Sequence, residues 1–206
     1  MYIFITILTI VMFGFYLNEM RKTKLNTRTV IYVGLFSAIS YILNMMQLIS
    51  YPNGGGITLF SMLPIMLLGV IFGPGIGMTS GIILGVIKML NGGVFLHPLQ
   101  VILDYILANI VLGLAGIFGY NKKYKLMLGG LLVTVLSTAL CTLSGVVFFG
   151  QYAPEGMSAV TYSLIYNVSS LGVEGMLTSS LLTLIPISRL LKVANSNQSQ
   201  KQKLEG

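Results

Sequence analysis

The stretch Met127–Phe149, MLGGLLVTVLSTALCTLSGVVFF, decides the fold class because it contains no charged side chain. A helix needs about 20 predominantly apolar residues to cross the hydrocarbon core of a bilayer, and this run is long enough. Its apolar residues are continuous and do not alternate with polar ones, which argues against a strand of an outer-membrane barrel. The stretch therefore predicts a transmembrane α-helix.

The composition of the rest of the chain agrees with a membrane protein. Of its 206 residues, 55% are hydrophobic and only 8% are charged, and the mean hydropathy is +0.88. Such a chain has too few charges to cover a soluble protein of this size, so much of its surface faces lipid. We predict an all-α integral membrane protein, with further helices near residues 2–19, 29–48, 57–72, 77–90, 98–119 and 161–188.

The basic residues predict the orientation. They fall in three groups, within residues 21–28, 122–125 and 189–203, and the positive-inside rule places all three in the cytoplasm. The net charge of +7 then orients the protein and meets anionic lipid headgroups, and it does not indicate nucleic acid. We expect a multi-pass protein of a prokaryotic plasma membrane.

The same rule places three connections outside the cell, namely Gln47–Gly56, Asn91–His97 and Gly150–Val160. The first predicted helix has no basic residue before its apolar run and several after it, which favours a retained anchor over a cleaved signal peptide.

Several kinds of chemistry lack a motif in this sequence. No Gly-x-x-x-x-Gly-Lys-Ser/Thr loop is present, so no nucleotide site is indicated. A lone Cys141 and a lone His97 do not predict a metal cluster, and no Gly-x-Ser-x-Gly or His-Glu-x-x-His motif occurs. We expect neither a metal nor a cofactor, and we expect no enzymatic activity.

Polar residues recur at regular spacing at the start of the helix predicted over residues 98–119. His97, Gln100 and Asp104 follow i, i+3, i+7 spacing, which predicts that all three share one helical face. A carboxylate at membrane depth is costly unless it faces partners or water, so Asp104 is expected to point into the bundle as part of a functional site. The alternative is a structural hydrogen-bond acceptor between helices.

The same spacing recurs in the last predicted helix, at Asn167, Ser170 and Glu174. For Glu174, a role in ligand binding and a role in pairing helices stay equally open. Lys88 lies inside an apolar run near its external end, and we expect its amine to reach the headgroups. Phe149 and Tyr162 fall at the external boundary, where their rings would suit a flat, partly cationic heterocycle beside Asp104 and Asn167.

Three segments resemble the thiamine-specific substrate-binding subunit of energy-coupling factor (ECF) transporters. They are Ser144–Ser158 (SGVVFFGQYAPEGMS), Tyr162–Asn167 (YSLIYN) and His97–Tyr105 (HPLQVILDY). The resemblance implies a six-helix substrate-binding membrane domain over residues 29–190. It leaves 1–28 as an additional N-terminal transmembrane helix with a basic linker, and 191–206 as a polar cytoplasmic tail.

The resemblance also implies function and partners. A subunit of this family binds thiamine from outside and delivers it through a separate membrane coupling subunit and two cytoplasmic ATPases. Asp104 holds the place of the family's acidic ligand contact, and Tyr162 and Asn167 match two further contacts. Gly34 and Ala38 resemble the family's patch that contacts the coupling subunit. Tyr51, Asn53 and Gly55 lie in the loop that matches the family's lid over the binding site.

The chain departs from the family at two positions. Phe149 stands where the family usually has tryptophan, and Cys141 where it has histidine. The expected binding residues are completed by Gly145, Gln100, His97 and Glu174. The departures imply either a weaker thiamine site or another ligand, such as a hydroxymethylpyrimidine precursor.

Two readings from other classes stay open. In the first, a structural or assembly membrane protein uses its polar residues only to join helices. In the second, a stand-alone transporter uses Asp104 and Glu174 to carry protons.

Overall fold

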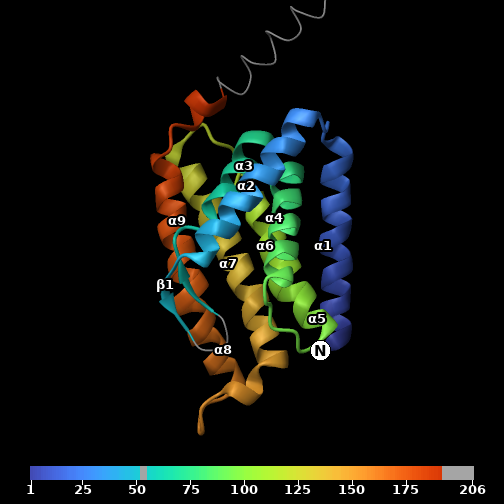
Figure 1. Cartoon of the computed structure of the whole chain (residues 1–206), viewed down its shortest axis with the longest axis vertical. Helices are drawn as coiled ribbons and strands as arrows, with labels where there is room; N and C mark the ends of the chain where they lie inside the picture. Colours follow the sequence, from blue (N-terminus) through green and yellow to red (C-terminus); the bar gives the residue numbers. More distant parts are fainter. Residues whose placement is uncertain (52–54, 192–206) are drawn as a thin grey trace, which may run out of the picture.

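The computed structural model describes residues 1–51 and 55–191, which form a bundle of helices along one long axis (Figure 1). Within these residues, three helices are long and apolar enough by themselves to cross a membrane: α1 (Tyr2–Lys22), α2 (Thr27–Met45) and α7 (Lys123–Phe148). Shorter helices complete the bundle, namely α3 (Leu63–Phe72), α4 (Pro74–Leu90), α8 (Ala159–Asn167) and α9 (Val173–Leu184).

Two paths through the bundle change their helical form on the way. The first is α5 (Pro98–Val101), then a π-helical segment (Ile102–Leu107), α6 (Ala108–Ile110) and a 3-10 turn (Val111–Leu114). The second joins α8 to α9 through a π-helical segment (Val168–Gly172). The predicted fold class, an all-α membrane bundle with one additional N-terminal helix, is confirmed.

A short hairpin replaces the ends of two predicted helices. Strands β1 (Gln47–Ser50) and β2 (Gly56–Thr58) pair antiparallel, whereas the sequence predicted helix up to residue 48 and again from 57. Gly56 explains part of the difference, because its φ of +155° is rarely adopted by residues with a side chain. The hairpin adds an element that periodicity alone did not indicate.

A row of glycines on α4 lets two helices touch through their backbones. Gly77, Gly81 and Gly85 lie one turn apart and face the backbone of residues 105–113. A Cβ atom at Gly81 would lie 2.7 Å from the carbonyl carbon of Asn109, closer than real Cβ contacts allow. Larger residues would therefore push α4 away from the path that carries Asp104.

The two ends of the bundle differ in charge. The basic linker between α1 and α2, the start of α7 and the C-terminal end of α9 lie at one end (Figure 1). The start of α1, the start of α5 and the α7–α8 connection lie at the other end. This arrangement agrees with the predicted orientation, with the basic end in the cytoplasm.

Helix α1 lies at the edge of the bundle, beside α4 and α5 (Figure 1). Its Ile5 is fully buried, and the Tyr16 and Thr79 hydroxyls are hydrogen bonded at 3.1 Å. Most of its other large apolar side chains are exposed, as expected for a helix that faces lipid.

Candidate functional site

A cavity of about 520 Å³ lies inside the bundle, near the end that holds the hairpin and the α7–α8 connection. Its walls come from α2, the hairpin, α4, the α5–α6 path, α7 and the α8–α9 path. Small-molecule sites in proteins commonly measure about 300–1,000 Å³, so this cavity is large enough for a vitamin-sized ligand.

Asp104 lines the cavity from the π-helical segment, together with its neighbour Tyr105. Gln100 holds the carboxylate in place, since its Nε2 donates a hydrogen bond of 2.8 Å to Asp104 Oδ2. Gln100 is itself only 1% exposed, and its Oε1 accepts from the backbone N–H of Leu96 at 3.2 Å. Single π-helical turns inside helices are frequent at functional sites, and here Asp104 and Tyr105 of such a segment both line the cavity.

Helix α7 contributes a continuous strip of the wall. Ser137, Cys141, Gly145 and Phe149 follow each other at four-residue intervals, and all four line the cavity. Gly145 is required for close packing, because a Cβ atom there would lie 2.8 Å from Ser163 Cβ on α8. The absence of a side chain at Gly145 thus brings α8 against α7.

The α8–α9 path adds Tyr162, Asn167, Ser170 and Glu174 to the wall. The Asn167 side chain is oriented by its own helix, since Nδ2 donates to the Ser163 carbonyl at 2.9 Å. The spacing argument for Asn167, Ser170 and Glu174 therefore holds: all three face the same cavity.

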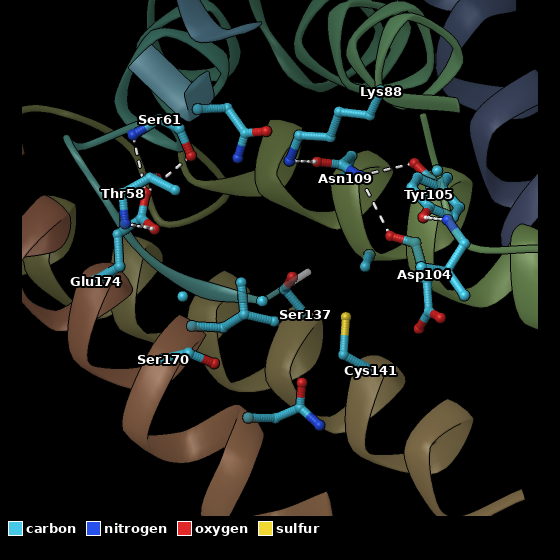
Figure 2. Close-up of a pocket in the computed structure, with 18 of the residues that line it drawn as sticks. Thr58, Ser61, Lys88, Asp104, Tyr105, Asn109, Ser137, Cys141, Ser170 and Glu174 are labelled. Carbon is cyan, nitrogen blue, oxygen red and sulfur yellow. Dashed lines mark hydrogen bonds between the residues drawn. The ribbon is translucent and has the colours of Figure 1, made fainter. Parts of the chain in front are cut away.

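Glu174 is hydrogen bonded to the end of the hairpin and to the segment that follows it. Its carboxylate accepts hydrogen bonds from the Thr58 N–H at 3.1 Å and from the Ser61 N–H and hydroxyl, both at 2.8 Å. Figure 2 shows these bonds as dashed lines, with Glu174 reaching from α9 toward Thr58 and Ser61. The carboxylate is 2% exposed, so it fastens β2 to α9 from within the bundle.

The hairpin is held over the cavity from a second side. The Gly55 N–H donates to the Tyr166 hydroxyl at 2.8 Å, and the Tyr51 ring meets the Tyr166 ring edge-on at 5.6 Å between centroids. Gly55 lines the cavity, whereas Tyr51 is not among the lining residues. Asn53, which we also expected in the lid, lies outside the described residues.

His97 does not share the face of Gln100 and Asp104. It caps α5 in an extended conformation, with its Nδ1 accepting from the Leu99 N–H at 3.1 Å. Its ring stacks on Tyr2 of α1 and on Phe148, with centroid distances of 5.5 and 5.1 Å, and it is not among the residues that line the cavity. The i, i+3, i+7 argument failed here because a capping residue precedes the regular helix.

Lys88 was interpreted wrongly from the sequence. Its side chain does not extend to the headgroups but lines the cavity, where Nζ donates to Asn109 Oδ1 at 3.4 Å (Figure 2). The close packing at Gly85, one turn earlier on α4, sets Lys88 opposite this amide. The polar Asn109 within an apolar run was the signal that could have revealed this contact.

Gly34 and Ala38 lie away from the cavity. Both are exposed on the outer face of α2, and a Cβ atom at Gly34 would meet no other atom within 4 Å. This surface is open to a neighbouring helix.

Comparison with known proteins gives the chain its family. The model of the family described as "Thiamine transporter protein (Thia_YuaJ)" matches residues 30–194. The chain belongs to this thiamine transporter family. The match leaves out α1, which is therefore an addition to the part that the family shares.

Relatives in the thiamine transporter family agree over most of the chain. The thiamine transporter ThiT of Bacillus subtilis is 31% identical over 177 residues, which cover 78% of this chain and 92% of that protein. ThiT of Lacticaseibacillus paracasei is 32% identical over 130 residues, or 57% of this chain and 62% of that one. A solved structure of ThiT from Listeria monocytogenes has the same fold, with a TM-score of 0.64 at 24% identity, and covers 78% of this chain and 97% of its own.

Family membership and the apolar helices together make this chain a multi-pass transport protein of the bacterial cell membrane, and not an enzyme. Within residues 1–51 and 55–191, no group of three His, Cys, Asp or Glu side chains could hold a metal ion. The side chains that line the cavity provide one amine, two carboxylates, several amides and several aromatic rings.

Proposed function

We propose that this protein is the substrate-binding membrane subunit of an ECF-type importer, and that it binds thiamine in the cavity between its helices. The observation that carries the proposal is the cavity itself, in which Asp104, Asn167 and the aromatic residues Phe149 and Tyr162 line one space. The names of the relatives support thiamine as the ligand.

Each of these residues has a role that suits a cationic heterocycle. Asp104, oriented by Gln100, supplies a negative charge and hydrogen-bond acceptors. Asn167 offers an amide to the edge of an aminopyrimidine. Phe149 offers a ring face to the thiazolium, for which a cation–π contact provides about 0.5–2 kcal/mol.

The hairpin is the lid of this site. Its contacts with Tyr166 and Glu174 hold it closed, and both are made to residues of the α8–α9 path that also line the cavity. Release of these contacts would open the cavity toward the external end. The lid therefore controls entry of the ligand.

Delivery requires partners. In our proposal, the exposed small residues Gly34 and Ala38 on α2 permit close approach of a membrane coupling subunit, which two cytoplasmic ATPases drive. The sequence has no nucleotide-binding loop of its own, which suits this division of labour.

A second ligand is supported by a specific observation. Phe149 and Cys141 line the cavity where the family usually has tryptophan and histidine, so contact with the thiazolium half is reduced. A hydroxymethylpyrimidine precursor of thiamine keeps the pyrimidine half, which Asp104 and Asn167 would bind. It is the alternative ligand.

Uptake of labelled thiamine into vesicles tests the transport mechanism. The protein is reconstituted alone, with a coupling subunit and its ATPases, and with ATPases that cannot hydrolyse ATP. We expect accumulation only with active ATPases. Accumulation by the protein alone, driven by a pH gradient, would instead identify a stand-alone proton-coupled transporter.

A further inference from the structure

Lys88 presents an amine to the cavity. The ligand contacts proposed above involve Asp104 and Asn167 and give this amine no role. It projects from the last turn of α4, and the backbone packing of Gly85 against Tyr105 fixes that turn. The wall therefore carries an amine in addition to two carboxylates.

The two carboxylates already have partners. Gln100 donates to Asp104, and Glu174 accepts three hydrogen bonds from the residues at and after β2. Lys88 has one partner among the described residues, the Asn109 side chain at a long 3.4 Å, and no carboxylate there lies within ion-pair distance of it.

An ammonium group has three N–H donors, of which this bond uses one. Because Lys88 lines the cavity, the others can serve an acceptor on a ligand. A charged group at membrane depth is costly without such partners, and residues of this kind commonly belong to substrate sites.

The chemistry of the ligand limits what Lys88 can bind. A positive thiazolium ring and an ammonium group repel each other, so Lys88 cannot be a partner of the ring. The one oxygen of thiamine is the hydroxyl at the end of its side arm, and a hydroxyl accepts hydrogen bonds. The ring would then lie toward Asp104 and Phe149, and the arm toward Lys88.

We propose that Lys88 is a specificity-determining residue that binds the side-arm hydroxyl of the ligand through the amine it presents to the cavity. This inference rests on the proposed function, since it deepens the description of the same site. Lys88 selects for ligands with an oxygen on the side arm and against analogues that lack it.

A ligand pair tests this selection in the purified full-length protein. The Kd of thiamine is compared with that of the analogue in which an ethyl arm replaces the hydroxyethyl arm. A hydrogen bond to a charged group predicts that the unaltered protein prefers thiamine about tenfold or more. In Lys88→Met, which keeps most of the length of the side chain but lacks the amine and its charge, we expect this ratio to fall to about one.

Two matched variants keep the test informative. Lys123→Met removes an exposed amine at the start of α7, away from the part of that helix that lines the cavity. It should leave the tenfold ratio unchanged. Lys88→Arg retains the charge and the donors and should keep a clear preference for thiamine, even where Lys88→Met folds poorly. The ratio compares two ligands on one protein, so a general loss of stability does not move it.

Three results would overturn the inference. One is an unchanged ratio in Lys88→Met, and another is equal binding of the two ligands by the unaltered protein. In both, thiamine still binds and the proposed function stands. If the unaltered protein binds neither ligand, the proposed function fails and the role of Lys88 fails with it.

Discussion

Replacing Glu174 with glutamine should loosen the hairpin from α9. The carboxylate accepts three hydrogen bonds from Thr58 and Ser61 at 2.8–3.1 Å, and it is 2% exposed, so water does not substitute for them. Glutamine keeps one acceptor oxygen and replaces the other with an NH₂ group. The NH₂ group of glutamine then faces an N–H group that donated to the carboxylate, and two donors cannot form a hydrogen bond.

The magnitude follows from these bonds. Hydrogen bonds to charged groups contribute about 1.5–3 kcal/mol each, and neutral ones about 0.5–1.5 kcal/mol. Losing one charged bond and weakening the others predicts about 2–4 kcal/mol less stability for the closed hairpin, equivalent to about 30- to 1,000-fold more frequent opening.

Hydrogen exchange measures this opening directly. The amides of Thr58 and Ser61 should exchange faster in Glu174→Gln by about that factor, while those of the α7 core stay protected. Glu155→Gln is the matched control, because Glu155 is exposed in the α7–α8 connection. Exchange at residues 58–61 that stays within twofold of the unaltered protein would refute the role of Glu174 in holding the hairpin closed.

Other changes have separate expected outcomes. Asp104→Ala should weaken thiamine binding more than tenfold in a calorimetric titration, given about 1.5–3 kcal/mol for a charged hydrogen bond, and an unchanged Kd would remove Asp104 from the site. Phe149→Trp should tighten binding by about threefold, because tryptophan is the better cation–π partner, and a weaker complex would argue against stacking there. Gly81→Leu should lower the thermal unfolding temperature strongly, since a Cβ atom already collides with the Asn109 backbone; a temperature equal to that of the unaltered protein would contradict the packing account.

Much of the fold was predictable from local sequence. Continuous apolar runs gave the helices, because lipid requires that each segment satisfy its own backbone. The hairpin was not predictable in this way, since Gln47–Ser50 carries no strong strand pattern and is specified by pairing with Gly56–Thr58. The π-helical segments around Asp104 and after Asn167 were also not predicted, because helical periodicity does not distinguish a π-helical turn from an α-helical one.

The candidate site followed the same division. Helical spacing placed Asn167, Ser170 and Glu174 on one wall correctly, because all three belong to one helical path. It failed for His97, which lies before the first regular turn. The Lys88 side chain was misassigned because the position of a residue along a membrane helix does not tell which way its side chain points. The close approach of α4 to Asn109 sets that orientation.

A calorimetric titration of the purified full-length protein in detergent tests the central claim most directly, with thiamine and its hydroxymethylpyrimidine half as separate ligands. The account predicts one site per molecule that binds thiamine with submicromolar Kd and more tightly than the pyrimidine half. Tight binding of the pyrimidine half with no binding of thiamine would contradict it, and would assign the cavity to the precursor.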